Sequence, residues 1–144
     1  MRIVSVKSMV VELPFRRPFV VWRGEIPSKP HVFVALTTDT GVTGWGEAAP
    51  FLFYAPETAH DIDAFIRHAM RDELLGQDPR DVRHLMDTFA MFDGHLMAKA
   101  AIETALWDIL GQAAGLPLYR LLGGAVREAV PLTIVLHSDE PSHM

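Results

Sequence analysis

Residues 31–47 read HVFVALTTDTGVTGWGE and carry the clearest structural signal in the chain. Residues 31–38 and 42–47 are rich in β-branched and aromatic side chains, and a short turn sequence, Asp39-Thr40-Gly41, separates them. This arrangement predicts a β-hairpin. Upstream, residues 2–13 form another Val- and Ile-rich run, which closes at Pro14 because proline cannot donate to a strand ladder. We therefore predict a three-stranded antiparallel meander at the start of the chain.

Helical periodicity follows the meander. Apolar residues recur at helical spacing after Thr58, a good N-cap, and this first helix should end at Gly76. A second helix should start at Asp78-Pro79, and a third should run from about residue 95 to 114 and close at Gly115. The third helix is apolar around most of its circumference, which indicates burial on several sides. The expected fold class is α+β, a three-stranded meander followed by a helical bundle.

The last apolar run, residues 130–136, differs from the earlier strands. It reads VPLTIVL and is almost continuously apolar, a pattern typical of a strand buried on both faces of a parallel sheet. The predicted antiparallel strands lie about 90 residues earlier in the chain and offer no parallel partner. We interpret this run as the beginning of a separate structure.

Composition limits the function. The net charge is −5 and the basic residues are scattered, so we expect no nucleic-acid partner. No apolar run reaches the roughly 18 residues of a membrane span, and we expect a cytoplasmic protein without a membrane partner. Exchanging the 2 Tyr for the 10 Gly brings the apolar share from 49% to about 54%, above the 45–50% usual for soluble domains. Such a surplus indicates an apolar face covered by another domain or by another subunit of a homo-oligomer.

Signatures of catalysis are missing from the sequence. There is no cysteine, no Gly-X-Ser-X-Gly, no phosphate-binding glycine loop and no His-Glu-X-X-His. No two of the seven histidines lie four apart on a predicted helix, so we expect neither a metal site nor catalytic residues here. Glu47 and Asp108 stand out because a carboxylate in such apolar surroundings needs a partner. Structural hydrogen bonding is the favoured interpretation of both, with catalysis as the alternative.

Two aromatic segments, residues 14–30 and 48–56, are predicted as loops. If the strands pair as predicted, both segments leave the same end of the sheet. Their aromatic residues are Phe15, Phe19, Trp22, Phe51, Phe53 and Tyr54. One interpretation is a local core beneath long loops. The other is an apolar wall over a ligand supplied by another part of the protein.

Three motifs, in order, give the chain a resemblance to a known family. Residues 38–48 resemble the "T-D-x-G-x-x-G-x-G-E" hairpin of the enolase superfamily, in its mandelate racemase and muconate-lactonizing enzyme type. Residues 98–109, AKAAIETALWDI, are similar to the helix "A-K-x-A-I-D-x-A-L-W-D" of that family, and residues 115–124 are similar to its link "G-x-P-L-x-x-L-L-G-G". The resemblance implies that residues 1–124 are the N-terminal capping domain and its link. Residues 125–144 would then be the first strand of a truncated (β/α)8 barrel.

The same resemblance implies the chemistry. Members abstract a proton next to a carboxylate and stabilise the enolate on Mg²⁺. We expect the barrel, outside these residues, to bind Mg²⁺ and to carry the bases, so the chain by itself should be inactive. The cap would contribute specificity toward a small carboxylate-containing substrate, through the candidate substrate-binding residues Phe19, Trp22, Arg23, Phe51, Phe53 and Tyr54.

Two further stretches of sequence narrow the resemblance to a group within the family. The motif "R-x-P-F-V" followed by Trp22-Arg23-Gly24, together with residues 130–141, looks most like the cis-3-hydroxy-L-proline dehydratase group. Dipeptide epimerases, N-acylamino acid racemases and cycloisomerases resemble the chain almost as closely. The alternative function is a stand-alone α+β module that binds a ligand or a protein through the aromatic loops.

Overall fold

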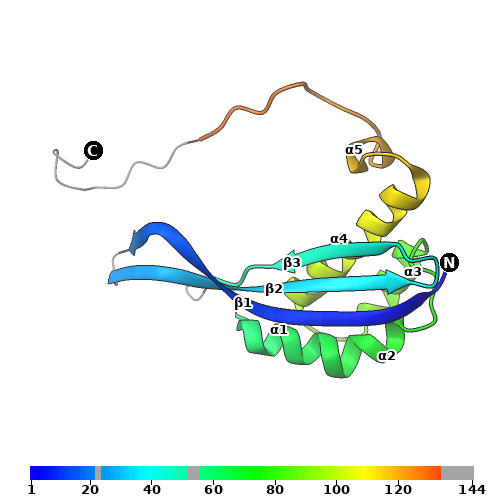
Figure 1. Ribbon diagram of the computed structural model, residues 1–144, viewed down its shortest axis with the longest axis horizontal. Helices are drawn as coiled ribbons and strands as arrows, with labels where there is room; N and C mark the ends of the chain where they lie inside the picture. The colour runs from blue at the N-terminus through cyan, green and yellow to red at the C-terminus, as the bar shows by residue number, and fades with distance from the viewer. Residues whose placement is uncertain (22–23, 52–55, 134–144) are drawn as a thin grey trace.

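Three antiparallel strands form one sheet in the order β1-β2-β3, and the helices cover one of its faces (Figure 1). The computed structural model describes residues 1–21, 24–51 and 56–133. The elements are β1 (Ile3–Val21), β2 (Gly24–Thr38), β3 (Thr43–Ala48), α1 (Ala59–Phe65), the π-helix η1 (Ile66–Met70), α2 (Arg71–Leu74), α3 (Val82–Phe89), α4 (Leu96–Ala114) and α5 (Leu118–Leu121). The predicted α+β class, a meander followed by helices, is confirmed.

The hairpin between β2 and β3 has the predicted turn. Gly41 adopts a positive φ of 84°, and its N–H donates to the Thr38 carbonyl at 3.0 Å. A left-handed residue at this place favours glycine because a Cβ would meet the neighbouring carbonyl. Alternate residues of β2, Val32, Val34 and Leu36, are fully buried, which fixes the face that meets the helices.

The prediction of a loop over residues 14–30 was wrong. β1 and β2 continue past the sheet as a two-stranded hairpin arm, here residues 14–21 and 24–30, in which Pro14 pairs with Ser28 and Phe19 with Ile26. A register shift between Pro14 and Phe19 takes up the extra residues of β1. Prolines are tolerated there because a bulge leaves backbone groups outside the ladder. The arm projects beyond the helices (Figure 1), so most of its side chains are exposed.

The first predicted helix forms as three consecutive segments, α1, η1 and α2. Thr58 caps it as expected: its hydroxyl accepts from the Asp61 N–H at 3.1 Å, and the Asp61 carboxylate accepts from the Thr58 N–H at 3.0 Å. The next helix, α3, begins at Val82 and not at Pro79. Asp78 explains the difference, because its carboxylate binds the Arg80 side chain and backbone and closes a turn before the helix.

Helix α4 lies against β3 and forms the centre of the core. Its buried residues are Ala98, Ala101, Ile102, Ala105, Leu106, Ile109 and Gly111. Most of them recur at helical spacing along one stripe, and Ala100 and Thr104 on another side are exposed, so the prediction of burial on several sides was wrong. Its small residues face Gly44 and Gly46, where the strand and helix backbones approach closely. Gly115 ends the helix with a positive φ of 64°, as the sequence predicts.

Beyond α5 the chain leaves the domain and runs back past the sheet toward the hairpin-arm side (Figure 1). Residues 125–133 form neither helix nor strand, and Val126, Val130 and Leu132 are 93%, 71% and 90% exposed. Residues 134–144 lie outside the described part, so the assignment of 125–144 to a barrel strand stays a prediction. Among the helices of the described residues, none has the length and apolar character to span a membrane.

Candidate functional site

Three aromatic side chains of the two predicted aromatic segments, Phe15, Phe19 and Phe51, gather at one end of the sheet, as expected from the register. The rings of Phe15 and Phe19 on the hairpin arm are 6.0 Å apart between centroids. Phe19 meets Phe51, in the segment after β3, edge to face at 6.1 Å. The Lys29 ammonium lies 5.4 Å from the centre of the Phe51 ring, within cation–π range. The arm and the segment after β3 therefore meet through their side chains.

Two of the six predicted substrate-binding residues, Phe19 and Phe51, are thus placed side by side. Trp22, Arg23, Phe53 and Tyr54 lie outside the described residues. Phe19 is 36% exposed, and Phe15 beside it is 37% exposed. An aromatic cluster that keeps this much open surface at the edge of a domain differs from a closed local core. Its role in substrate binding stays a prediction.

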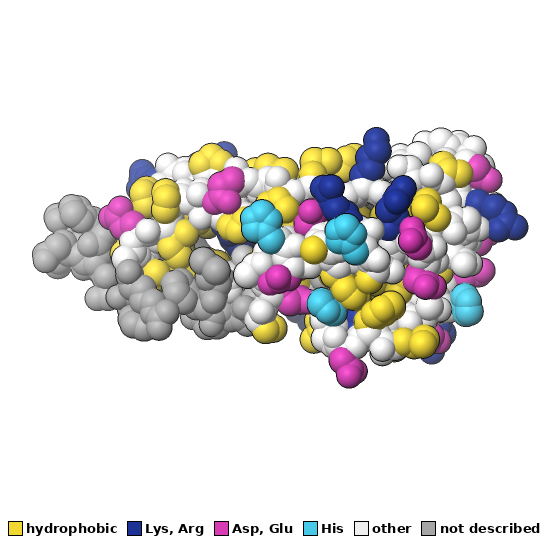
Figure 2. Space-filling model, turned by 90° about the horizontal axis from the view of Figure 1, so that it is seen from below, with side chains coloured by type: hydrophobic (Ala, Val, Ile, Leu, Met, Phe, Trp, Pro, Cys, Tyr) yellow, Lys and Arg dark blue, Asp and Glu magenta, His cyan; other side chains and the backbone are white. Residues whose placement is uncertain are grey.

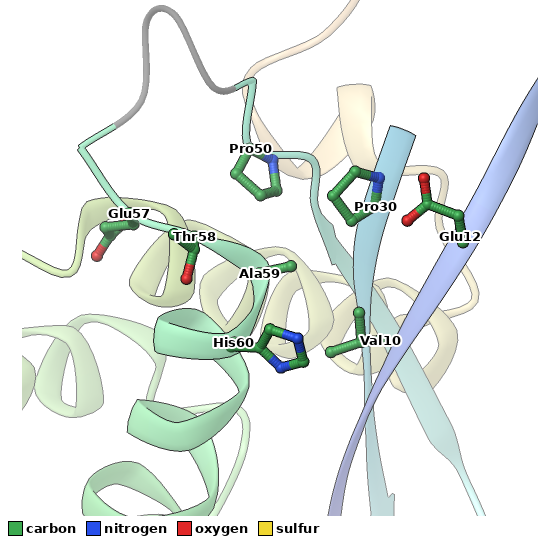
Figure 3. A pocket seen from close by; sticks show the side chains of 8 residues that line it. All are labelled: Val10, Glu12, Pro30, Pro50, Glu57, Thr58, Ala59 and His60. Carbon is green, nitrogen blue, oxygen red and sulfur yellow. The ribbon is translucent and has the colours of Figure 1, made fainter. Parts of the chain in front are cut away.

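A small cavity lies at the base of the hairpin arm (Figure 3), with a volume of about 230 Å³. It is lined by Val10, Glu12, Pro30, Pro50, Glu57, Thr58, Ala59 and His60. The His60 ring points across it toward Val10, and the Glu12 carboxylate accepts a hydrogen bond from the Ser28 hydroxyl on the opposite strand. Ligand pockets usually measure about 300–1,000 Å³, so this cavity is too small to be the main binding site.

A second cavity, about 340 Å³, lies between Phe51 and the start of α4. Glu57 and His95 form its polar wall, and sequence reasoning missed both. The Glu57 side chain is 10% exposed, and its Oε2 accepts from the Met97 N–H at 3.0 Å. Its Oε1 lies 3.4 Å from Nδ1 of His95, whose ring stacks on Phe65 at 3.8 Å. The contact between Glu57 and His95 leaves no pattern in the sequence, because the two residues lie far apart in the chain, before different helices.

A third cavity, about 540 Å³, lies beside the C-terminal half of α4, between Trp45, Trp107 and Leu116. Asp108 lines it and accepts from the Trp45 N–H at 2.9 Å, so it joins α4 to β3. Glu47 pairs with the imidazole of His31 on the neighbouring strand. Both carboxylates that stood out in the sequence therefore have structural partners, as the favoured interpretation expected.

Charge is distributed without a dominant sign on the face seen in Figure 2, where acidic, basic and histidine side chains are interspersed. Near the cavity at the base of the arm, hydrogen bonds from the Thr58 hydroxyl and N–H lower the pKa of Asp61.

Within the described ranges, no group of three His, Cys, Asp or Glu side chains could hold a metal ion. The donor set of this part of the chain therefore does not fit a magnesium centre.

Residues 3–123 match the family model described as the mandelate racemase / muconate lactonizing enzyme, N-terminal domain. The chain belongs to this family. It is therefore a member of the enolase superfamily, and the resemblance of the three motifs is confirmed. The family's domain match ends at residue 123, beside the predicted limit of the cap at residue 124.

Similar curated proteins include racemases, epimerases and dehydratases. The N-succinyl-L-Arg/Lys racemase of Bacillus cereus is 32% identical over 100% of this chain and 39% of its own length. The L-Ala-D/L-Glu epimerase of Bacillus subtilis is 31% identical, with the same coverage of both chains. The cis-3-hydroxy-L-proline dehydratase of Roseibium aggregatum is 33% identical over 100% of this chain and 40% of its own. The three sequence identities are nearly equal, so they do not favour the dehydratase group over the racemase and epimerase groups.

Solved structures agree with the fold. The crystal structure of the Bacillus cereus N-succinyl Arg/Lys racemase superposes with a TM-score of 0.91 at 32% identity, over 100% of this chain and 39% of that one. An enolase superfamily member from Roseovarius nubinhibens, solved in complex with magnesium, gives a TM-score of 0.78 at 37% identity, over 85% of this chain and 34% of that one. The chain thus spans about two fifths of the length of the curated relatives described above.

Proposed function

We propose that residues 1–124 are the specificity cap of a Mg²⁺-dependent enzyme that abstracts a proton next to a carboxylate. The observation that carries this proposal is the contact between Phe19 and Phe51, which joins the hairpin arm to the segment after β3 in one aromatic cluster at the end of the sheet. Two chain segments that meet in this way, with open apolar surface, suit a cap over a site built by another domain.

The partner domain would be a (β/α)8 barrel that begins with residues 125–144. The strong exposure of Val126, Val130 and Leu132 supports this, because closely spaced large apolar side chains are rarely all left open to water. Relatives about two and a half times as long as the chain support it as well. We further propose that the whole protein is a homo-oligomer, in which other subunits cover more of the apolar surface.

Within this function the chain binds and encloses the substrate. Phe19 and Phe51 would pack on its apolar part and exclude water, and Arg23 would pair with an anionic group. Trp22, Phe53 and Tyr54 complete the candidate set from sequence. Mg²⁺ would supply charge stabilisation for the enolate, and the barrel would hold it, since the described residues do not fit it. The chain alone is expected to be inactive.

The reaction is a racemisation or epimerisation, a dehydration or a cycloisomerisation. These are the activities that the names of the relatives carry, for the racemase, the epimerase, the dehydratase and the muconate cycloisomerase 1 of Rhodococcus opacus. All of them suit a small substrate with a carboxylate. We expect the cap not to select among them by chemistry, because the proposal assigns the reacting groups to the barrel.

Proton exchange tests this function. The protein that joins residues 1–144 to a barrel would be incubated with Mg²⁺ in D₂O against N-acylamino acids, dipeptides, hydroxyprolines and muconate. Exchange or product would be followed by proton NMR, with residues 1–144 alone as the control. We expect turnover of at least one carboxylate by the whole protein and none by the control. Absence of exchange on the whole panel, with tight ligand binding by residues 1–144 alone, would favour the stand-alone module.

A further inference from the structure

The face of the sheet opposite the helices carries no other element of the described residues (Figure 1). Side chains alternate between the two faces of a strand, and Val32, Val34 and Leu36 occupy the helix face. We call the opposite face the outer sheet face, and its apolar residues are Met9, Val11 and Leu13 on β1, Phe33 and Ala35 on β2, and Trp45 on β3. Met9, Leu13 and Trp45 are 42%, 38% and 51% exposed. Large apolar side chains gathered on one open face mark an interaction surface.

Side chains occupy outward backbone groups at both edges of the sheet. At the β3 edge, the Asp108 carboxylate accepts from the Trp45 N–H at 2.9 Å. At the β1 edge, the Arg67 guanidinium donates to the Ser8 carbonyl at 2.9 Å. A strand added at either edge would have to break these bonds, a common protection of edge strands. A partner of this sheet is therefore expected on the outer sheet face.

Charges at opposite borders make the outer sheet face complementary to itself. The register places Lys7 of β1, Ala35 of β2 and Trp45 of β3 in one row, and Glu47 follows Trp45 on the same face. Lys7 is exposed and has no ion pair within the described part of the chain. The Glu47 side chain is 46% exposed, although it also pairs with His31. The β1 border is therefore basic and the β3 border is acidic.

A second copy of the chain fits these charges through a two-fold axis parallel to β2. Rotation about such an axis, within the interface, lays β1 of each copy over β3 of the other. Lys7 then lies over the Trp45 ring and beside the Glu47 carboxylate of the second copy, and the same contact forms twice. The small side chain of Ala35, at the centre, suits the usual spacing of about 10 Å between packed sheets. An axis across the strands would instead place β1 on β1 and leave Lys7 without a countercharge.

We propose that the outer sheet face is the interface between two copies of this chain, paired about a two-fold axis parallel to β2. The proposal deepens the homo-oligomer of the proposed function and does not depend on the cap's role toward substrate. The face spans about 30 by 15 Å at ordinary strand spacings. This is about half of the roughly 800 Å² that each partner buries in a standard interface, so the association is reversible, with a Kd of micromolar order.

Charge reversal tests the interface in the chain of 144 residues, by sedimentation equilibrium. The wild type should show a monomer–dimer equilibrium. Lys7→Glu and Glu47→Lys should each weaken dimerisation by about 10-fold or more, because like charges then face each other twice. An equimolar mixture of the two variants should recover it, since every facing pair is again opposite in sign. Arg83→Glu on α3 and Glu73→Lys on α2 are the matched controls, because they change the net charge equally at exposed positions off this face.

The results decide between a second copy and other occupants. A wild type that stays monomeric up to about 1 mM overturns the proposal, and so does a mixture that associates no better than its components. If circular dichroism shows a charge variant to be unfolded, Trp45→Ala decides, with a loss of about 10-fold expected. The mixing is repeated with the whole protein, where mixed dimers support the proposal and their absence, with the barrel over the face, overturns it. Absence of carboxylate turnover would remove the proposed function without changing these results.

Discussion

The backbone of Gly46 in β3 lies so close to α4 that a Cβ on Gly46 would come within 1.8 Å of the Ala101 carbonyl oxygen. Gly44, on the same face of the strand, would meet the Ala105 carbonyl oxygen at 2.2 Å. Both obstacles are backbone atoms, which cannot rotate away as a side chain can. The Gly-Trp-Gly sequence is therefore required by the packing of strand on helix, and its glycines need no role in ligand binding.

Gly46→Ala should destabilise the domain by about 3 kcal/mol or more, because the new methyl group forces β3 and α4 apart. Urea unfolding followed by circular dichroism measures this. Thr43→Ala, on the same strand with its side chain on the opposite face, is the control and should cost less than about 1 kcal/mol. Equal effects of the two changes would show that the close approach is not a stability determinant.

Asp108→Ala should cost about 1.5–3 kcal/mol, since it removes the charged acceptor of the Trp45 N–H. Asp108→Asn keeps an oxygen at that place and should recover most of the loss. Thermal unfolding of both variants gives the comparison. In the whole protein Asp108→Asn should retain activity, and a large fall in kcat with this variant would instead make Asp108 catalytic.

Thr58→Ala should cost about 1 kcal/mol by removal of the helix cap. It should also raise the pKa of Asp61 toward the ordinary value of 3.8, because the Thr58 hydroxyl is the largest cause of its lowering. Carbon-detected NMR titration of the Asp61 carboxyl measures the shift. Thr104→Ala, on the exposed side of α4, serves as the control. A pKa of Asp61 that does not move would contradict the capping-box assignment.

Arg80→Ala should change the acid dependence of stability. Hydrogen bonds from the Arg80 side chain lower the pKa of Asp78, so the folded state gains stability above the ordinary value of 3.8 and loses it as the pH falls below. The variant should be less stable at pH 7 by at most about 1 kcal/mol. The difference in unfolding free energy between wild type and variant should narrow below pH 3.8. A constant difference down to pH 2 would be inconsistent with this linkage.

Phe19→Ala in the whole protein should raise KM more than it lowers kcat, because the side chain is proposed to enclose substrate. A double-mutant cycle with Phe51→Ala should give a coupling free energy of about 0.5–1.5 kcal/mol for the ring pair. Val20→Ala changes the next residue of the arm, which is 57% exposed, and should leave KM unaltered. Equal KM changes for Phe19→Ala and Val20→Ala would argue against a specific role.

Much of the fold could be predicted because it depends on local patterns. The β-branched and aromatic runs on either side of Asp39-Thr40-Gly41 predicted the hairpin, and the mostly apolar circumference of about residues 95–114 predicted α4. The arm could not be predicted, since Pro14 and Pro18 locally indicate a loop and the pairing that orders them, Phe19 with Ile26, is between strands. Glu57 and His95 were missed for a related reason. Each is an unremarkable polar residue in the sequence, and only the packing of α4 beside α1 joins them.

The hairpin arm has a consequence for how such a protein diversifies. Its residues lie outside the packed interior, which is built from β1–β3 and the helices, so substitutions on the arm do not disturb the Gly46–Ala101 contact. Under the proposed function, mutations on the arm that alter ligand preference would therefore carry little penalty in folding. A lineage that keeps its glycines and α4 would then acquire new substrates by drift on the arm, while purifying selection acts on the interior.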